Sequence, residues 1–334
     1  MEDLRLRWRG DAADFATALA LSSDGKHVVV GSGAGGLSAF DAETGALRFG
    51  RQAHPGGTNA VDVAGDLIAS GGNDGKLRLT DLATGAERAV IDGEPRAWVE
   101  HVAFSPSGAV LAMASGKVLR FLDRTGAVLH RIEAAPSTIA GLAWNRRGTE
   151  LAVAAYGGLR TYRPASGERA KYFPWKGSLV SIAWSPDEKV VACGTQDCGV
   201  HFWRLAAGGA DSEMSGYPSK PKTLAWDAGS TMLATGGDVT VVVWSFVGKG
   251  PEGTTPIQLA GHGKLVTRLA FHPRKGLLAS ASQDGSIFVW EPKKSTKPLY
   301  FASMAAEVTG LLWSSSTGAL VATDAEGGVA CFGP

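Results

Sequence analysis

Histidine, serine and aspartate, the residue types of a nucleophilic triad, occur within a short stretch of the sequence as His262, Ser280 and Asp284. Such a triad activates the serine hydroxyl for attack on a carbonyl carbon. In one large class of hydrolases the serine lies in a G-x-S-x-G turn, and this sequence contains no such turn. We therefore expect no catalysis from these residues, and the sequence offers no other catalytic candidate.

A glycine-rich run satisfies the pattern G-x-G-x-x-G through Gly31, Gly33 and Gly36. That pattern binds a dinucleotide when a helix N-terminus follows it and an acidic residue stands about 20 positions further on. Here only Leu37–Phe40 separate the glycines from a turn-like segment, Asp41–Gly45. We expect these glycines to serve turns between strands, and we expect no nucleotide or other cofactor.

Metal binding was considered for Cys193 and Cys198, with His201 nearby. A structural zinc site needs four ligands, and the seven histidines are scattered along the sequence. The sequence therefore predicts no metal site, and it favours a cysteine buried in a strand. Three cysteines are too few for a disulfide framework, which favours reduced thiols in a cytoplasmic protein.

Charge and hydropathy exclude further classes of function. The 33 Lys and Arg residues balance 32 Asp and Glu residues, so no overall field would attract nucleic acid. The N-terminus has no apolar stretch of signal-peptide length, and no run approaches 18 apolar residues. We expect a protein that binds neither nucleic acid nor a membrane.

A repeat organises these residues along the whole chain. Similar segments end in a large apolar residue about every 40 residues, at Leu21, Val63, Phe104, Trp144, Trp184, Trp226, Phe271 and Trp313. Within each unit, short apolar runs alternate with turns of the Ser-Pro-Asp-Gly or Asp-Gly kind, and no sustained helical periodicity occurs. Four antiparallel strands in about 40 residues are typical of one blade of a β-propeller.

The segment from Ala260 to Trp290 resembles a WD repeat. The resemblance implies a buried hydrogen-bond network of His262, Ser280, Asp284 and Trp290, rather than a triad. A second, partial network would consist of His54, Ser70 and Asp74, with Thr80 where the family has an aromatic residue. Each network would fix the loops between strands and satisfy buried polar groups.

The number of units gives the predicted architecture. We expect one all-β domain, residues 1–334, with eight four-stranded antiparallel blades; seven blades is the alternative. The last unit stops at Phe332 before a fourth strand, while Leu4–Arg9 is a strand-like run without a unit. We expect this N-terminal strand to close the last blade, because closure removes exposed sheet edges.

A second resemblance leaves an alternative function open. Asp41–Phe49 and Asp81–Gly85 resemble turns of quinoprotein-like propellers. That resemblance would imply an enzyme with a site in the central channel.

The preferred prediction is a non-catalytic scaffold, a monomer that binds a protein or peptide on one face. Connections that enter each first strand carry aromatic and basic residues, which suit an acidic and apolar partner segment. The candidate contact residues are Arg96, Trp98, Trp175, Lys176, Tyr217, Lys220, Lys222 and Lys264.

Overall fold

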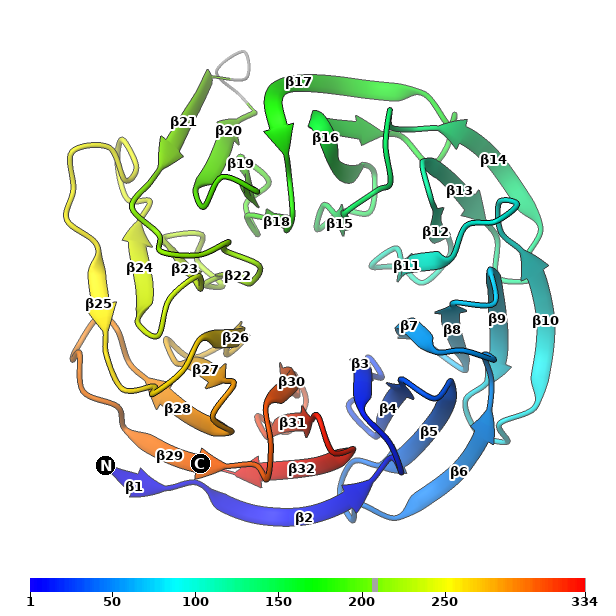
Figure 1. Cartoon of the computed structure of the whole chain (residues 1–334), viewed down its shortest axis with the longest axis horizontal. Coiled ribbons are helices and arrows are strands. Elements are labelled where there is room, and N and C mark those ends of the chain that lie inside the picture. The colour runs from blue at the N-terminus through cyan, green and yellow to red at the C-terminus, as the bar shows by residue number, and fades with distance from the viewer. Residues whose placement is uncertain (206–209, 334) are drawn as a thin grey trace.

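The computed structural model describes residues 1–205 and 210–333, and it shows eight sheets, or blades, of mainly antiparallel strands arranged in a ring (Figure 1). This confirms the predicted eight-bladed β-propeller. The described residues form no helix, and so none that is long and apolar enough to cross a membrane.

The strands of each blade follow one another along the chain, from the centre of the ring outward. Blades 1 to 4 consist of β3 (Ala16–Leu21), β4 (His27–Ser32), β5 (Gly36–Asp41) and β6 (Leu47–Gln52); β7 (Thr58–Ala64), β8 (Leu67–Gly72), β9 (Lys76–Asp81) and β10 (Glu87–Asp92); β11 (Val99–Phe104), β12 (Leu111–Ser115), β13 (Val118–Leu122) and β14 (Val128–Glu133); and β15 (Gly141–Trp144), β16 (Leu151–Tyr162) and β17 (Arg169–Ser178).

Blades 5 to 8 continue the same order, except that the outer strand of blade 8 comes from the N-terminus. They consist of β18 (Ala183–Trp184), β19 (Val190–Gly194), β20 (Val200–Arg204) and β21 (Ala210–Met214); β22 (Leu224–Trp226), β23 (Met232–Thr235), β24 (Val241–Ser245) and β25 (Ile257–Leu259); β26 (Val266–Phe271), β27 (Leu278–Ser282), β28 (Ser286–Trp290) and β29 (Tyr300–Ser303); and β30 (Val308–Trp313), β31 (Leu320–Asp324), β32 (Gly328–Gly333) and β2 (Arg5–Asp11).

In blade 4 the second and third strands run together as β16. Its first half pairs with β15 and its second half with β17. Gly157 and Gly158 separate the halves with φ angles of 82° and 115°, which side chains other than hydrogen rarely allow. The two glycines therefore let the chain reverse without a longer loop.

Burial explains the strand sequences. The second strand of a blade lies inside its sheet and is covered by a neighbouring blade on each side, so β8, β12 and β27 are buried at every residue. Their sequences are accordingly rich in Leu and Ala and contain no charged residue. Outer strands such as β6, β10 and β14 are mostly exposed.

Hydrogen bonds connect the inner strands of neighbouring blades at both ends of these strands. At one end, the indole of Trp144 donates to the Ala103 carbonyl oxygen (3.0 Å), and Trp313 donates in the same way to Ala270 (3.0 Å). At the other end, Thr267 Oγ1 donates to the carbonyl oxygen of Val308 (2.6 Å). Such bonds hold the blades in fixed positions around the ring.

The N-terminal strand closes the ring as predicted, because β2 pairs antiparallel with β32. Trp8 is buried, and its indole donates to the Ala42 carbonyl oxygen of blade 1 (2.9 Å). A further pairing was not predicted: β1 (Glu2–Asp3) lies parallel to β29 on the outside of blade 7. Leu4, between the two strands, packs into a cluster shared by blades 7 and 8.

Two faces of the disc follow from this topology. We call loop face the side that carries the connections from each outer strand to the next inner strand, together with the turns between second and third strands. The opposite face carries the turns between inner and second strands. The predicted contact residues belong to the loop face.

Candidate functional site

The network predicted in blade 7 is a chain of hydrogen bonds. Trp290 Nε1 donates to Ser280 Oγ (2.8 Å), which lies 2.7 Å from His262 Nε2. On the other side of the imidazole, His262 Nδ1 lies 2.6 Å from Ser286 Oγ, and this hydroxyl donates to Asp284 (2.5 Å). Ser286, which the sequence reading missed, therefore stands between the histidine and the aspartate.

The chemistry of the end groups fixes the direction of this chain. A carboxylate only accepts, so Ser286, which donates its one proton to Asp284, must accept a hydrogen bond from His262 Nδ1. Ser280 accepts from the Trp290 indole and donates its own proton to His262 Nε2. This assignment requires a neutral imidazole. Burial lowers the pKa of His262 to about 4, which agrees with that state. With both of its nitrogens engaged, the histidine has no free position to act as a base.

Blade 2 carries a shorter version of the network. Nδ1 of His54 lies 2.9 Å from Asp74, and Nε2 lies 2.8 Å from Ser70 Oγ. Arg78 donates to the second oxygen of Asp74 (2.6 Å). Thr80 stands where blade 7 has Trp290, and its buried Oγ1 has no hydrogen-bond partner among the described residues.

The glycine-rich run joins two strands of blade 1, as the sequence reading expected. Gly31 lies in β4 and Gly36 is the first residue of β5, so the glycines are followed by a strand and not by a helix. A Cβ on Gly31 would lie 2.6 Å from the Thr58 side chain of blade 2. A Cβ on Gly35 would lie 1.6 Å from the carbonyl oxygen of His54. These glycines allow neighbouring blades to approach each other.

The position of Trp175 corrects one premise of the sequence reading. Trp175 and Lys176 were expected on a connection, but both lie within β17, because that outer strand extends to Ser178. The Trp175 ring packs against the buried imidazole of His201, with 3.9 Å between ring centroids. Trp175 is half-buried and is a packing residue of blades 4 and 5.

Tyr217 is also engaged inside the fold. Its hydroxyl lies 2.8 Å from Thr235 Oγ1 and accepts a hydrogen bond from Trp244 Nε1 (2.7 Å). Burial raises the pKa of Tyr217. Trp98 differs from both residues, because 55% of its surface is exposed.

Arg96 and Trp98 line a depression of about 420 Å³ on the loop face, beside the turn Asn73–Gly75 of blade 2. Three carboxylates also line it, and each has a cationic partner. The pairs are Asp74 with Arg78, Asp92 with Lys76, and Glu94 with Arg120 and Arg131.

Arg96 is the unpaired charge of this depression. Among the described residues, no carboxylate lies within ion-pair distance of its guanidinium. Its backbone has a φ of 61°, a left-handed conformation that is unfavourable for a residue with a side chain. Strained backbone of this kind is frequent at binding sites.

The remaining predicted cations lie farther around the loop face. Lys176 belongs to blade 4, Lys220 and Lys222 to the β21–β22 connection, and Lys264 to the β25–β26 connection. With Arg96 and Trp98 on the β10–β11 connection, the set extends over about half of the ring (Figure 1). None of these four lysines forms an ion pair with a described residue.

Two exposed aromatic residues of the loop face were missed. Phe15, on the connection into β3, is 44% exposed, and Tyr156, at the hairpin of blade 4, is 55% exposed. The predicted site was limited to the connections into first strands that combine basic and aromatic residues. A large aromatic residue directly before Gly157 and Gly158 was the available signal for Tyr156.

No cluster of three or more histidine, cysteine or acidic side chains placed to bind a metal occurs in residues 1–205 and 210–333. Cys193 is fully buried in β19, and burial raises the pKa of its thiol.

Comparison with known proteins relates this geometry to a family. The model of the WD domain, G-beta repeat, matches residues 170–204 and 253–291. Telomerase protein component 1 of Mus musculus is 26% identical over 95% of this chain, which covers 13% of that protein. The transcriptional corepressor LEUNIG_HOMOLOG of Arabidopsis thaliana is 24% identical over 68% of this chain, which covers 34% of that protein.

A third relative is the probable cytosolic iron-sulfur protein assembly protein 1 of Mycosarcoma maydis, 28% identical over 64% of this chain and 39% of that protein. The chain thus spans well under half the length of these relatives. Among solved structures, the computationally designed Ika8 protein matches with a TM-score of 0.83 at 22% identity, over 98% of this chain and 99% of that one. This match supports the fold.

Proposed function

Because the chain is a WD-repeat β-propeller, we propose that it is a protein-interaction scaffold whose loop face binds an acidic segment of a partner at Trp98 and Arg96. The observation that carries the proposal is the depression beside blade 2, where every carboxylate is paired and Arg96 is not. An incoming carboxylate would therefore meet an uncompensated cation.

Trp98 supplies the apolar part of the proposed contact. Large aromatic residues with few rotatable bonds bury much area at a low entropic cost, and they dominate many interfaces. Trp98 is the exposed aromatic side chain next to the unpaired cation, on a connection held between two rigid blades. Phe15 and Tyr156 are further exposed aromatic residues on the same face.

The unpaired lysines act at longer range in this proposal. Lys176, Lys220, Lys222 and Lys264 would speed the encounter with an acidic segment without packing against it. The proposal includes a single domain that acts as a cytoplasmic monomer and catalyses no reaction. A net charge of +1 gives no general attraction to nucleic acid or to membranes.

The test is a selection of displayed random peptides on the purified protein, followed by binding kinetics of the enriched peptides. We expect enrichment of Asp and Glu near an apolar residue. Arg96→Glu should weaken binding at least tenfold, mainly through slower association. Trp98→Ala should act mainly through faster dissociation, because a packed anchor is lost.

Two control variants separate this site from the rest of the surface. Lys275→Glu reverses an exposed charge on the opposite face, and Leu47→Ala removes an exposed apolar side chain from an outer strand. Both should bind the selected peptides like the wild type. Peptides whose binding survives both Arg96→Glu and Trp98→Ala would place the site elsewhere.

A further inference from the structure

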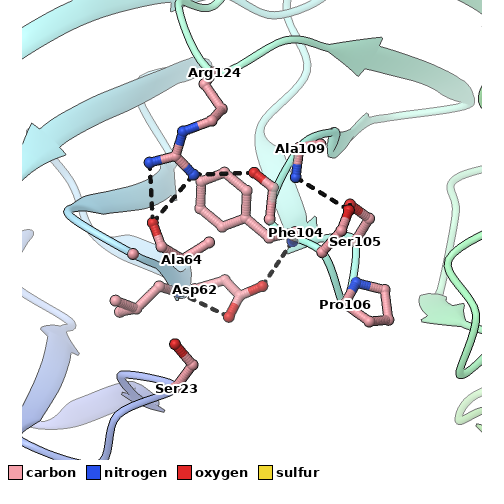
Figure 2. A pocket seen from close by; sticks show the side chains of 12 residues that line it. Ser23, Asp62, Ala64, Phe104, Ser105, Pro106, Ala109 and Arg124 are labelled. Carbon is pink, nitrogen blue, oxygen red and sulfur yellow. Dashed lines mark hydrogen bonds between the residues drawn. The ribbon is translucent and has the colours of Figure 1, made fainter.

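The turn between the inner and second strands is shortest in blade 2. Only Gly65 and Asp66 connect β7 to β8, whereas five or six residues make this turn in every other blade. The short turn leaves a cavity of about 610 Å³ in the opposite face, between the turns of blades 1 and 3 (Figure 2). Ser23 lines one side and Ser105–Ala109 line the other.

Asp62 is the unusual residue of this cavity. It directly precedes Val63, the large apolar residue of the repeat, and the other blades have an apolar residue at that position: Ala20, Ala103, Ala143, Ala183, Ala225, Ala270 and Leu312. One oxygen of Asp62 accepts a hydrogen bond from the Val63 amide (2.8 Å) and the other from the Phe104 amide (2.7 Å). No described cation forms an ion pair with this carboxylate.

Arg124, the other charged residue that lines the cavity, is already neutralised. Its guanidinium donates to Asp66 (2.6 Å) and to the carbonyl oxygens of Gly108 (3.0 Å) and Ala64 (3.3 Å). Figure 2 shows Arg124 and its bonds to the carbonyl oxygens at the far side of the cavity from Ser23. The uncompensated charge in the cavity is therefore negative, and it belongs to Asp62.

We propose that this cavity binds a primary ammonium group, carried either by a lysine side chain of a partner or by a small amine, with Asp62 as the counter-ion. The Ser23 hydroxyl, which has no hydrogen-bond partner among the described residues, lies on the Asp62 side of the cavity and is available to accept a second N–H (Figure 2). The site is on the opposite face and is independent of the proposed function.

The donor set favours ammonium over other cations. A calcium or magnesium ion takes six or more oxygen ligands, often from several carboxylates, and this cavity has one uncompensated carboxylate. A guanidinium binds best when both oxygens of a carboxylate are open, and here each already accepts a backbone N–H. A compact ammonium needs one carboxylate oxygen and neighbouring hydroxyls.

The experiment uses the whole protein and two probes, butylammonium and the peptide acetyl-Gly-Lys-Gly-amide, with the same peptide acetylated on lysine as the neutral control. Binding is followed through the amide NMR signals of Val63 and Phe104, which bond to Asp62. We expect saturable shifts with both amines and none with the acetylated peptide. Tighter binding of the peptide indicates a lysine of a partner, and tighter binding of butylammonium indicates a small amine.

Two variants test the site by different means. Asp62→Asn removes the charge, and Ser23→Trp fills the cavity from an exposed turn while Asp62 itself is unchanged. Each should weaken binding at least tenfold, while Ala228→Trp, at the equivalent turn position of blade 6, should bind like the wild type. Burial raises the pKa of Asp62 to about 6, so its carboxylate is mostly ionised at pH 7 and mostly protonated at pH 5. Binding of the amines should therefore be roughly tenfold weaker at pH 5 than at pH 7.

Three results would overturn the inference. They are shifts that survive both Asp62→Asn and Ser23→Trp, equal shifts with the acetylated peptide, and no shift of either amide at high millimolar amine. If Asp62→Asn fails to fold, Ser23→Trp and the pH dependence still decide the question.

Discussion

At the scale of single residues, the two hydrogen-bond networks differ in how completely they are satisfied. The blade 7 chain ends in an indole donor and a carboxylate acceptor, so each of its hydroxyls has a defined role. In blade 2, Thr80 replaces the indole and brings a buried hydroxyl that makes no hydrogen bond with the described residues. A buried hydroxyl without a partner destabilises the folded state.

Thr80→Val should therefore raise the free energy of unfolding, by about 1 kcal/mol. The change keeps the side-chain shape and removes the unpaired hydroxyl. Chemical denaturation measures the effect. Ser70→Ala is the matched control, because that hydroxyl is bonded to His54 and its loss should lower stability. Destabilisation by Thr80→Val would mean that Oγ1 has a partner, such as a bound water.

His262 should make stability depend on pH. Its pKa is about 4 in the folded protein and about 6.5 in an unfolded chain, so the unfolded state gains a proton first as pH falls. The stability that the neutral imidazole provides is present above pH 6.5 and is lost between about pH 6.5 and 4. His262→Gln should flatten this part of the curve of unfolding free energy against pH, by on the order of 2–3 kcal/mol. Parallel curves for the two proteins would contradict a neutral, buried His262.

Residue types alone could not separate exposed aromatic residues from engaged ones. Trp98, Trp175 and Tyr217 have similar local sequences, which contain Gly, Pro and a basic residue. Their exposure is decided by partners far along the chain, such as His201 for Trp175 and Trp244 for Tyr217. Only Trp98 remains free to act as an anchor in the way the sequence reading expected.

At the scale of elements, the N-terminal segment contributes two strands that differ in how much they stabilise the fold. β1 adds two exposed residues to blade 7, whereas β2 completes blade 8 and buries Trp8. Removing residues 1–3 should change stability by less than about 0.5 kcal/mol. Removing residues 1–11 should lower it by several kcal/mol and lower the melting temperature sharply, because a sheet edge and a large apolar cavity are exposed.

Calorimetry of the two truncated proteins tests this difference, and the shorter truncation serves as the control for the longer one. Equal melting temperatures would show that β2 does not close the ring in solution.

The sequence predicted the closing strand but not β1 or the length of β17. The pattern of β2 was visible because an amphipathic run lay outside the repeat. The pairing of β1 depends on the path of the chain after the ring closes, and two residues carry no pattern. β17 extends to Ser178 because the tight hairpin at Gly157 and Gly158 brings its partner strand up to the loop face.

At the scale of the whole molecule, the period of the repeat was enough to predict the architecture. Eight similar units of about 40 residues, each with an apolar second strand, bury their faces only against one another. The sequence at Asp62 does show a shorter connection after Val63 and an acid where the other units have an apolar residue. The cavity itself depends on how the turns of blades 1, 2 and 3 lie together, which the period of the repeat does not describe.

The pairing of β2 with β32 also sets an order of events during synthesis. β2 leaves the ribosome before the strands of blade 1, but the strand that it must join is made more than 300 residues later. At roughly 5–20 residues per second, that delay is about 15–65 s. Throughout that time β2 lacks the strand that it pairs with, so its unpaired edge is open to other strands until the ring can close.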